Sequence, residues 1–179
     1  MVDQVSISER SSLGLATVMA RRGVGGAAIA AAIGLEPSSG PGRTAGPDFA
    51  LIGTGPGVWL ALAESPPESW PDALEQQLAG LCAISDQSGG YVVFRLSGPG
   101  ARELLQRGAA IDLHPAVFGP GSAATTVIAH IGVILWRPDA SESFEVAVFR
   151  SYASSFRHWL DLTSAWLGPT STRPHATSS

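Results

Sequence analysis

Residues 91–108, YVVFRLSGPGARELLQRG, have the order expected of a phosphate-binding turn, because a strand-like run enters a Gly-x-Gly turn and leaves as a helix. A dinucleotide-binding fingerprint would need a third glycine where this chain has Glu103, and no Gly-Lys-Ser/Thr of a P-loop follows. Pro99 also lacks a backbone N–H that could bind a phosphate oxygen. We therefore interpret the turn as a structural corner, with Ser97 as the helix cap and Pro99 in the first turn.

Asp112 and His114, in the sequence IDLHP, are the most suggestive pair for acid–base chemistry, because the carboxylate could orient the imidazole. The alternative is a hydrogen-bonded pair that closes a loop ahead of Pro115. The four histidines show no i, i+4 or His-x-His spacing, so no metal site is predicted. No Gly-x-Ser-x-Gly motif is present, and Cys82 lies between apolar neighbours as a buried side chain would.

The composition limits the classes of partner. Of the 179 residues 45% are hydrophobic and 15% are charged, and a surface that is poor in charge is typical of a large partner interface. The net charge is −4, with no basic cluster beyond Arg21-Arg22, so we expect no nucleic-acid binding. The longest apolar run, residues 25–35, is too short to span a membrane, and no signal peptide is visible. We expect a cytoplasmic protein.

The pattern of elements predicts an α+β fold of antiparallel sheets with helices packed on one face. We expect helices over residues 24–35, 69–80, 98–107 and 151–167, with Ser69 and Ser151 as caps and Trp159 and Trp166 in the core. Strands are expected between the helices, in the order βαββα, ββα and βββα. The predicted organisation is an N-terminal α/β subdomain (1–80) with a flexible loop at 36–47, a C-terminal strand-helix-meander-helix subdomain (81–168) and a disordered tail (169–179).

Several longer motifs lie within about residues 81–167: SDQSGG, VFRLSGPGARELLQRG, IDLHP, FGPG, AHIGVILWR and FEVAVFRSYASSFRHWL. Together they resemble the gamma subunit of heterotetrameric sarcosine oxidase. That family is similar in fold to the folate-binding domain of T-protein-type aminomethyltransferases. Their order of strand, Gly-Pro turn, helix, meander, strand and helix agrees with the order predicted here from the residues.

The resemblance implies a complex that oxidatively demethylates sarcosine, or a related secondary or N-methyl amine, to glycine. Hydrogen peroxide forms, and the one-carbon unit goes to tetrahydrofolate. The implied partners are larger alpha and beta subunits and a small zinc-binding delta subunit, and FAD, FMN, NAD and tetrahydrofolate are held on other subunits. For this chain we expect no catalytic, cofactor-binding or metal-binding residue and a structural role in assembly. Candidate partner-contact or structural residues are Asp112, His114, His130, Trp136 and Arg137.

Two alternatives stay open. The aminomethyltransferase pattern places acidic residues directly after the strand that here reads IGVILWRP, where this chain has Trp136 and Arg137. Folate chemistry on this chain is therefore not expected, but a small-molecule, folate-like binding module without catalysis is one alternative. The other is a stand-alone enzyme that uses His114 and Asp112.

Overall fold

Two five-stranded antiparallel sheets form the centre of the computed structural model, which describes residues 5–167. Sheet A has the strand order β1-β7-β10-β9-β8, and sheet B has the order β3-β4-β5-β2-β6. Sheet A consists of β1 (Ser6–Arg10), β7 (Tyr91–Ser97), β10 (Ser143–Phe149), β9 (Ile131–Trp136) and β8 (Ala123–Ile128). Sheet B consists of β3 (Arg43–Ala45), β4 (Phe49–Gly55), β5 (Val58–Glu64), β2 (Leu13–Ala20) and β6 (Cys82–Asp86).

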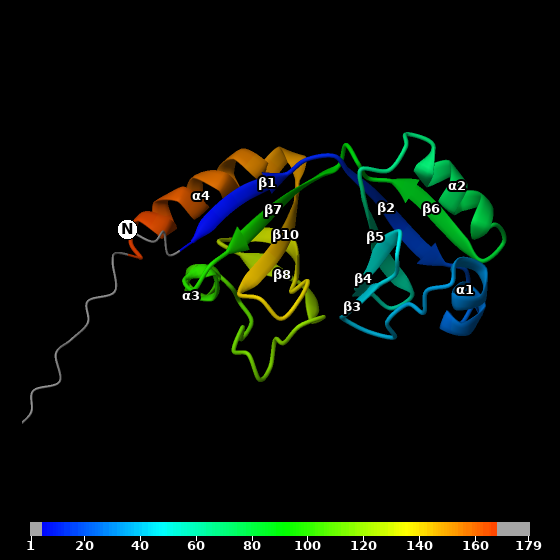
Figure 1. Ribbon diagram of the computed structural model, residues 1–179, viewed down its shortest axis with the longest axis horizontal. Coiled ribbons are helices and arrows are strands. Elements are labelled where there is room, and N and C mark those ends of the chain that lie inside the picture. Colours follow the sequence, from blue (N-terminus) through cyan, green and yellow to red (C-terminus); the bar gives the residue numbers. More distant parts are fainter. Residues whose placement is uncertain (1–4, 168–179) are drawn as a thin grey trace, which may run out of the picture.

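Each sheet has helices on the face that points away from the other sheet (Figure 1). Sheet B is covered by α1 (Gly26–Ile33) and α2 (Trp70–Gln77), and sheet A is covered by α3 (Ala101–Gln106) and α4 (Ala153–Ala165), which follows the 3-10 turn Arg150–Tyr152. The predicted α+β class with antiparallel sheets is confirmed. Within residues 5–167, no helix has the length and apolar character needed to cross a membrane.

The strand alternation determines which core each side chain enters. In β7, Val92, Phe94 and Leu96 face the helices of sheet A, whereas Val93 faces sheet B. The inner faces of both sheets meet in a shared core that includes Leu15, Ile52, Leu60, Leu62, Val93, Ala123, Ile134, Trp136 and Ala147. The two sheets therefore pack on each other through apolar side chains as well as through their connections.

The chain crosses between the sheets twice. β1 continues after two residues into β2, and β6 is joined to β7 by residues 87–90, so the blue strands β1 and β2 and the green strands β6 and β7 meet at the top of Figure 1. β1 pairs with β7, and β6 pairs with β2. The sheets consequently do not divide at residue 80, because strand pairing joins partners that local sequence patterns cannot identify.

Two strands lie in segments where none was predicted: β2, and β3 inside the segment 36–47. This segment, predicted as a flexible loop, is hydrogen-bonded to sheet B. The Trp59 indole donates to the Ser38 carbonyl at 3.0 Å, and the Gly53 N–H donates to the Gly42 carbonyl at 2.8 Å. β3 has only three residues, too few to show an alternation, and β2 is buried on both faces over much of its length, so its sequence does not alternate between apolar and polar residues.

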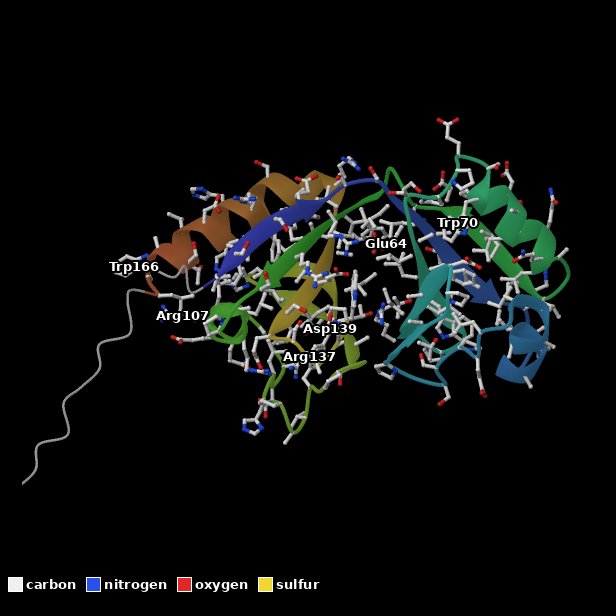
Figure 2. All side chains as sticks on the ribbon, in the orientation of Figure 1. Glu64, Trp70, Arg107, Arg137, Asp139 and Trp166 are labelled. Carbon is white, nitrogen blue, oxygen red and sulfur yellow. The ribbon has the colours of Figure 1, made fainter. Side chains whose placement is uncertain are left out.

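The predicted helix starts are correct to within a few residues, and Ser69 is the N-cap residue of α2 as predicted, although its side chain makes no capping hydrogen bond. The other two predicted caps are wrong, because the N-cap of α3 is Gly100 rather than Ser97 and Ser151 lies in the 3-10 turn before α4. Trp159 packs half-buried against the core of sheet A as expected. Trp166 was predicted in the core and is 78% exposed, at the far end of α4 (Figure 2). The predicted tail (169–179) lies outside the described residues.

Candidate functional site

The turn before α3 forms a corner whose backbone groups are already engaged. Gly98 has φ +111°, a conformation that favours glycine. Its N–H donates to the Glu142 carbonyl at 2.9 Å, and its carbonyl accepts from the Ala101 N–H at 3.0 Å. The turn therefore uses these groups to join β7, α3 and the loop before β10, as a structural corner does.

Asp112 and His114 close a loop, and the Asp112 carboxylate is not bonded to the His114 imidazole. Asp112 Oδ1 accepts from the backbone N–H of His114 at 2.8 Å, and His114 Nδ1 accepts from the backbone N–H of Ala116 at 3.2 Å. Both side chains are exposed. The geometry supports the loop-closing alternative, since the carboxylate does not orient the imidazole as a catalytic pair requires.

His130 is at the tip of the β8–β9 hairpin. Ala129 and His130 form a two-residue turn with φ values of +50° and +65°, between the paired residues Ile128 and Ile131. Two consecutive positive φ angles are typical of a type I′ turn. The Ala129 N–H donates to the Gly108 carbonyl at 3.1 Å, which holds the tip near the end of α3. The imidazole is exposed.

Trp136 and Arg137 are internal. Trp136 is 1% exposed and lies in the core between the sheets. Arg137 is 5% exposed, donates to the Ala140 and Ser141 carbonyls at 3.3 and 3.2 Å, and pairs with Glu142 at 3.6 Å. Both side chains are therefore used for packing and pairing within this chain.

Arg102 is what connects the loops of His114 and Arg137. Its guanidinium donates to the Leu113 carbonyl and, at 3.0 Å, to the Glu142 carboxylate, which also pairs with Arg137. The five predicted residues are otherwise distributed over a loop, a hairpin tip and a strand end. They do not form one site.

A buried ion cluster joins the two sheets and was not predicted. The Glu145 carboxylate on β10 accepts from Arg10 on β1 and, at 3.4 Å, from Arg95 on β7, and its side chain is only 4% exposed. Arg10 also pairs with Glu64 on β5 of sheet B, near the junction of the sheets (Figure 2). Burial lowers the pKa of Arg10, but the hydrogen bonds and charges of Glu64 and Glu145 outweigh burial and raise that pKa above its usual value.

The sequence contained one signal of this cluster: Glu145 interrupts the otherwise apolar strand FEVAVF. A carboxylate in such a strand must be paired or face solvent. Because Glu145 pairs with both Arg10 and Arg95, we interpret the cluster as a structural connection between strands.

An apolar cleft of about 290 Å³ lies between the sheets. Its walls are Thr17, Thr54, Val58, Trp59 and Leu60 from sheet B, and Tyr91, Thr125, Gly132, Val133, Ile134 and Phe149 from sheet A. The rings of Tyr91 and Phe149 stack with centroids 4.7 Å apart, and burial raises the pKa of the Tyr91 phenol. The Thr125 hydroxyl donates to the Thr54 carbonyl at 3.1 Å and bridges the two sheets.

Exposed apolar side chains surround this cleft. Phe149 is 51% exposed, Met19 is 50% exposed beside the lining residue Val58, and Val127 is 43% exposed opposite the lining residue Gly132. None of the described residues that line the cleft has a carboxylate, imidazole, guanidinium or thiol. The cleft can therefore accept an apolar group, and it offers no acid–base pair for catalysis. Over residues 5–167, no group of three or more His, Cys, Asp or Glu is placed to hold a metal ion.

Comparison with known proteins identifies the family. The model of the sarcosine oxidase gamma subunit family matches residues 20–166. This chain belongs to that family. The sarcosine oxidase subunit gamma of Corynebacterium sp. (strain U-96) is 34% identical over 141 residues, which cover 76% of this chain and 67% of the relative.

Two solved structures are similar to this fold. A chain of the heterotetrameric sarcosine oxidase from Corynebacterium sp. U-96, in complex with pyrrole 2-carboxylate, matches with a TM-score of 0.85 and 28% identity over 97% of this chain and 90% of that chain. The glycine cleavage system aminomethyltransferase T from Bartonella henselae matches with a TM-score of 0.67 and 14% identity over 88% of this chain and 45% of that chain. The predicted family and the predicted aminomethyltransferase-like fold are confirmed.

Proposed function

We propose that this chain is the gamma subunit of a heterotetrameric sarcosine-oxidase-type enzyme and contributes to its assembly without supplying a catalytic group. The structural match over nearly the whole chain to part of a heterotetrameric sarcosine oxidase supports this proposal. The complex would oxidatively demethylate sarcosine, or a related secondary or N-methyl amine, to glycine, with hydrogen peroxide formation and one-carbon transfer to tetrahydrofolate. FAD, FMN, NAD and tetrahydrofolate would be held by larger alpha and beta subunits, beside a small zinc-binding delta subunit.

The cleft between the sheets is the observation that carries the assembly role. It presents Phe149, Met19 and Val127 around a neutral, apolar hollow, and exposed apolar groups of this kind are typical of protein contacts. The residues that could have formed an acid–base site, Asp112 and His114, instead hold a loop closed.

Co-purification tests this function directly. A tagged chain isolated from its native cells should bring down larger subunits and show the visible absorption of bound flavin. Recovery of a colourless chain without partners would contradict the proposal. If the complex is recovered, its activity on sarcosine and on other N-methyl amines defines the substrate.

A folate-like ligand of this chain is the second candidate, and the fold shared with aminomethyltransferase T favours it. The residues present do not fit folate. The cleft has no charged lining residue. At the end of β9, where the resemblance leads one to look for a carboxylate, this chain has the buried residues Trp136 and Arg137. Isothermal titration of the chain with tetrahydrofolate should show no saturable heat, and saturable binding would favour this candidate.

A further inference from the structure

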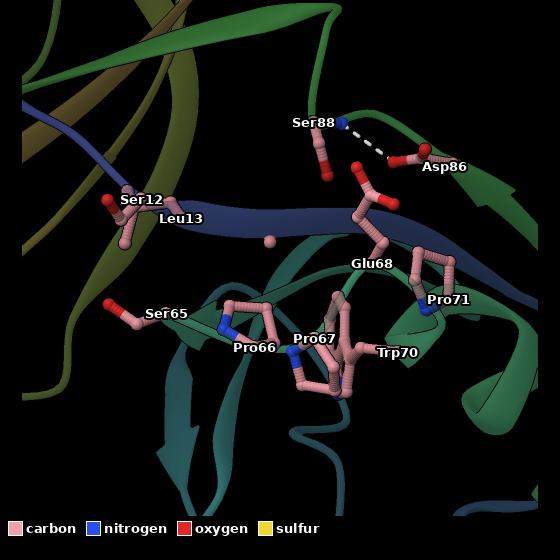
Figure 3. A pocket seen from close by; sticks show the side chains of 11 residues that line it. Ser12, Leu13, Ser65, Pro66, Pro67, Glu68, Trp70, Pro71, Asp86 and Ser88 are labelled. Carbon is pink, nitrogen blue, oxygen red and sulfur yellow. Dashed lines mark hydrogen bonds between the residues drawn. The ribbon is translucent and has the colours of Figure 1, made fainter.

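Trp70, the first residue of α2, separates two hollows on the outer side of sheet B, of about 450 and 490 Å³. Both hollows are lined by Ser65, Pro66, Pro67 and Trp70. We name the two hollows together the Trp70 groove. In the first hollow, Figure 3 shows the rings of Pro66, Pro67 and Trp70 on one side and the carboxylates of Glu68 and Asp86 on the other.

The groove is acidic. Glu68 and Asp86 line the first hollow, and Asp48 and Glu64 line the second, whereas no arginine or histidine is among the described residues that line either one. Glu64 alone of the four pairs with a cation, Arg10. Glu68, Asp86 and Asp48 have no ion-pair partner within residues 5–167.

Some carboxylates outside the groove have arginine partners, whereas others, such as Asp72 and Glu75, have none within residues 5–167. Glu103 pairs with Arg107, Asp161 with Arg157, and Glu142 with Arg102, each at about 3 Å. Within residues 5–167, three of the four groove carboxylates, Glu68, Asp86 and Asp48, thus have no arginine partner, and all three are exposed at the rim of the hollows. Their summed negative charge favours a cationic group in the groove.

The aromatic wall of the groove is held in place by tight packing. A Cβ at Gly14 would lie 2.5 Å from Pro66 Cγ and 2.9 Å from Trp70 Cε3, so both rings rest directly on the bare backbone of β2. The Phe49 ring meets Trp70 edge-on, with centroids 6.2 Å apart. A wall fixed in this way is preorganised, which lowers the entropic cost of binding.

We propose that the Trp70 groove binds a lysine- or arginine-bearing segment of a partner subunit. The aliphatic stem of the basic side chain lies on Trp70 and the prolines, and its cation pairs with Glu68 and Asp86. Charge complementarity selects this occupant, because a neutral or acidic segment would leave the carboxylates unpaired or repelled. This inference rests on the assembly proposed above and names the chemistry of one contact within it.

Carbodiimide coupling gives a sharp test, because the chain has no lysine: all of its 11 basic residues are arginine. Any carbodiimide cross-link from Glu68 or Asp86 to a lysine must therefore lead to another chain. In the purified complex, labelling of Glu68 and Asp86 by carbodiimide and glycine ethyl ester should fall several-fold relative to the free chain. Glu75, exposed on α2 outside both hollows, is the matched control and should label equally in both states.

Variants provide the second arm. The double variant Glu68→Gln/Asp86→Asn should weaken the complex by about tenfold and make it dissociate at lower salt, since two exposed ion pairs are lost. Glu75→Gln should leave the salt dependence unchanged. Gly14→Ala should weaken the complex without altering charge, because it displaces Pro66 and Trp70.

The outcomes separate the two proposals. A complex in which Glu68 and Asp86 label as freely as in the isolated chain, and in which the double variant assembles normally, would overturn the groove inference and leave the subunit role intact. Failure of any larger subunit to co-purify with the unaltered chain would overturn both.

Discussion

Arg10 connects the two sheets, so removal of its guanidinium should destabilise the whole molecule. It bonds Glu145 in sheet A and Glu64 in sheet B, and the Arg10 and Glu145 side chains are 18% and 4% exposed. In Arg10→Met the Glu145 carboxylate would remain buried with only Arg95, at 3.4 Å and 37% exposed. Breaking a fully buried pair costs about 3–5 kcal/mol, and the remaining Arg95 reduces the expected loss to about 2–3 kcal/mol.

Urea unfolding measures this loss. With a slope of about 2 kcal/mol per molar urea for a domain of this size, the midpoint should fall by about 1 M. Arg157→Met is the matched control, because Arg157 pairs with Asp161 on the exposed surface of α4, with side chains 45% and 53% exposed. That pair is worth about 0.3–0.5 kcal/mol, so the midpoint should move by roughly 0.2 M.

A double variant tests the reasoning itself. If the cost arises from an unpaired buried charge, Arg10→Met combined with Glu145→Gln should recover part of the stability lost in Arg10→Met alone. Equal midpoints for Arg10→Met and Arg157→Met would refute the view that the buried cluster holds the sheets together.

Three further changes follow from local geometry. Gly108→Ala should lower stability by about 1–3 kcal/mol in thermal unfolding, because the new Cβ would lie 2.6 Å from Trp159 Cζ2. His130→Gly should increase the free energy of unfolding by about 1 kcal/mol and so raise the melting temperature, since glycine accepts φ +65° without strain. The Ser141 hydroxyl and N–H hold the pKa of Asp139 below its usual value, so its stabilising effect is present at neutral pH and is lost as the pH falls below about 4. Asp139→Asn should flatten this acid dependence of urea unfolding.

Each of these expectations has its own counter-result. Gly89→Ala is the control for Gly108→Ala, because a Cβ at Gly89 would meet no atom within 4 Å. An equal loss of stability in both variants would show that the contact with Trp159 is not the cause. A lower melting temperature for His130→Gly would mean that the imidazole contributes more than the turn strain costs. An acid transition unchanged in Asp139→Asn would assign it to other carboxylates.

Local patterns predicted much of the fold. The strand-like run YVVFRLS is β7, and both of its faces are buried, because Val92, Phe94 and Leu96 pack under the helices and Val93 packs against sheet B. Pro99 and Glu103 argued for a structural corner at Gly98, whose N–H is bonded to the Glu142 carbonyl. The crossing of β1 and β6 between sheets was not predictable, because pairing over such distances depends on the assembled core. Trp166 was wrongly assigned to the core, because helical spacing predicts the face of the helix on which a side chain lies but not where the sheet beneath that helix ends.

The candidate site was harder to predict than the fold. Proximity in sequence suggested that Asp112 orients His114, but the carboxylate bonds to the backbone N–H, as Asp commonly does in turns. Arg10 and Glu145 are 135 residues apart, so no spacing could connect them. The groove around Trp70 combines the contiguous run 65–71 with Gly14 on β2 and Asp86 on β6, and no local pattern connects these three segments.

The crossing strands also determine when the protein can fold during synthesis. β10 lies between β7 and β9 in sheet A, although it is the last strand of the described residues, and β1 at the other end of the chain pairs with β7. Sheet A therefore cannot close until Phe149 has left the ribosome, and until then β7 and β9 lack the strand that joins them. Such late, long-range closure slows folding and leaves apolar strand edges exposed. We therefore expect partners that recognise sheet A to bind after β10 has been synthesised, because the sheet lacks an inner strand before then.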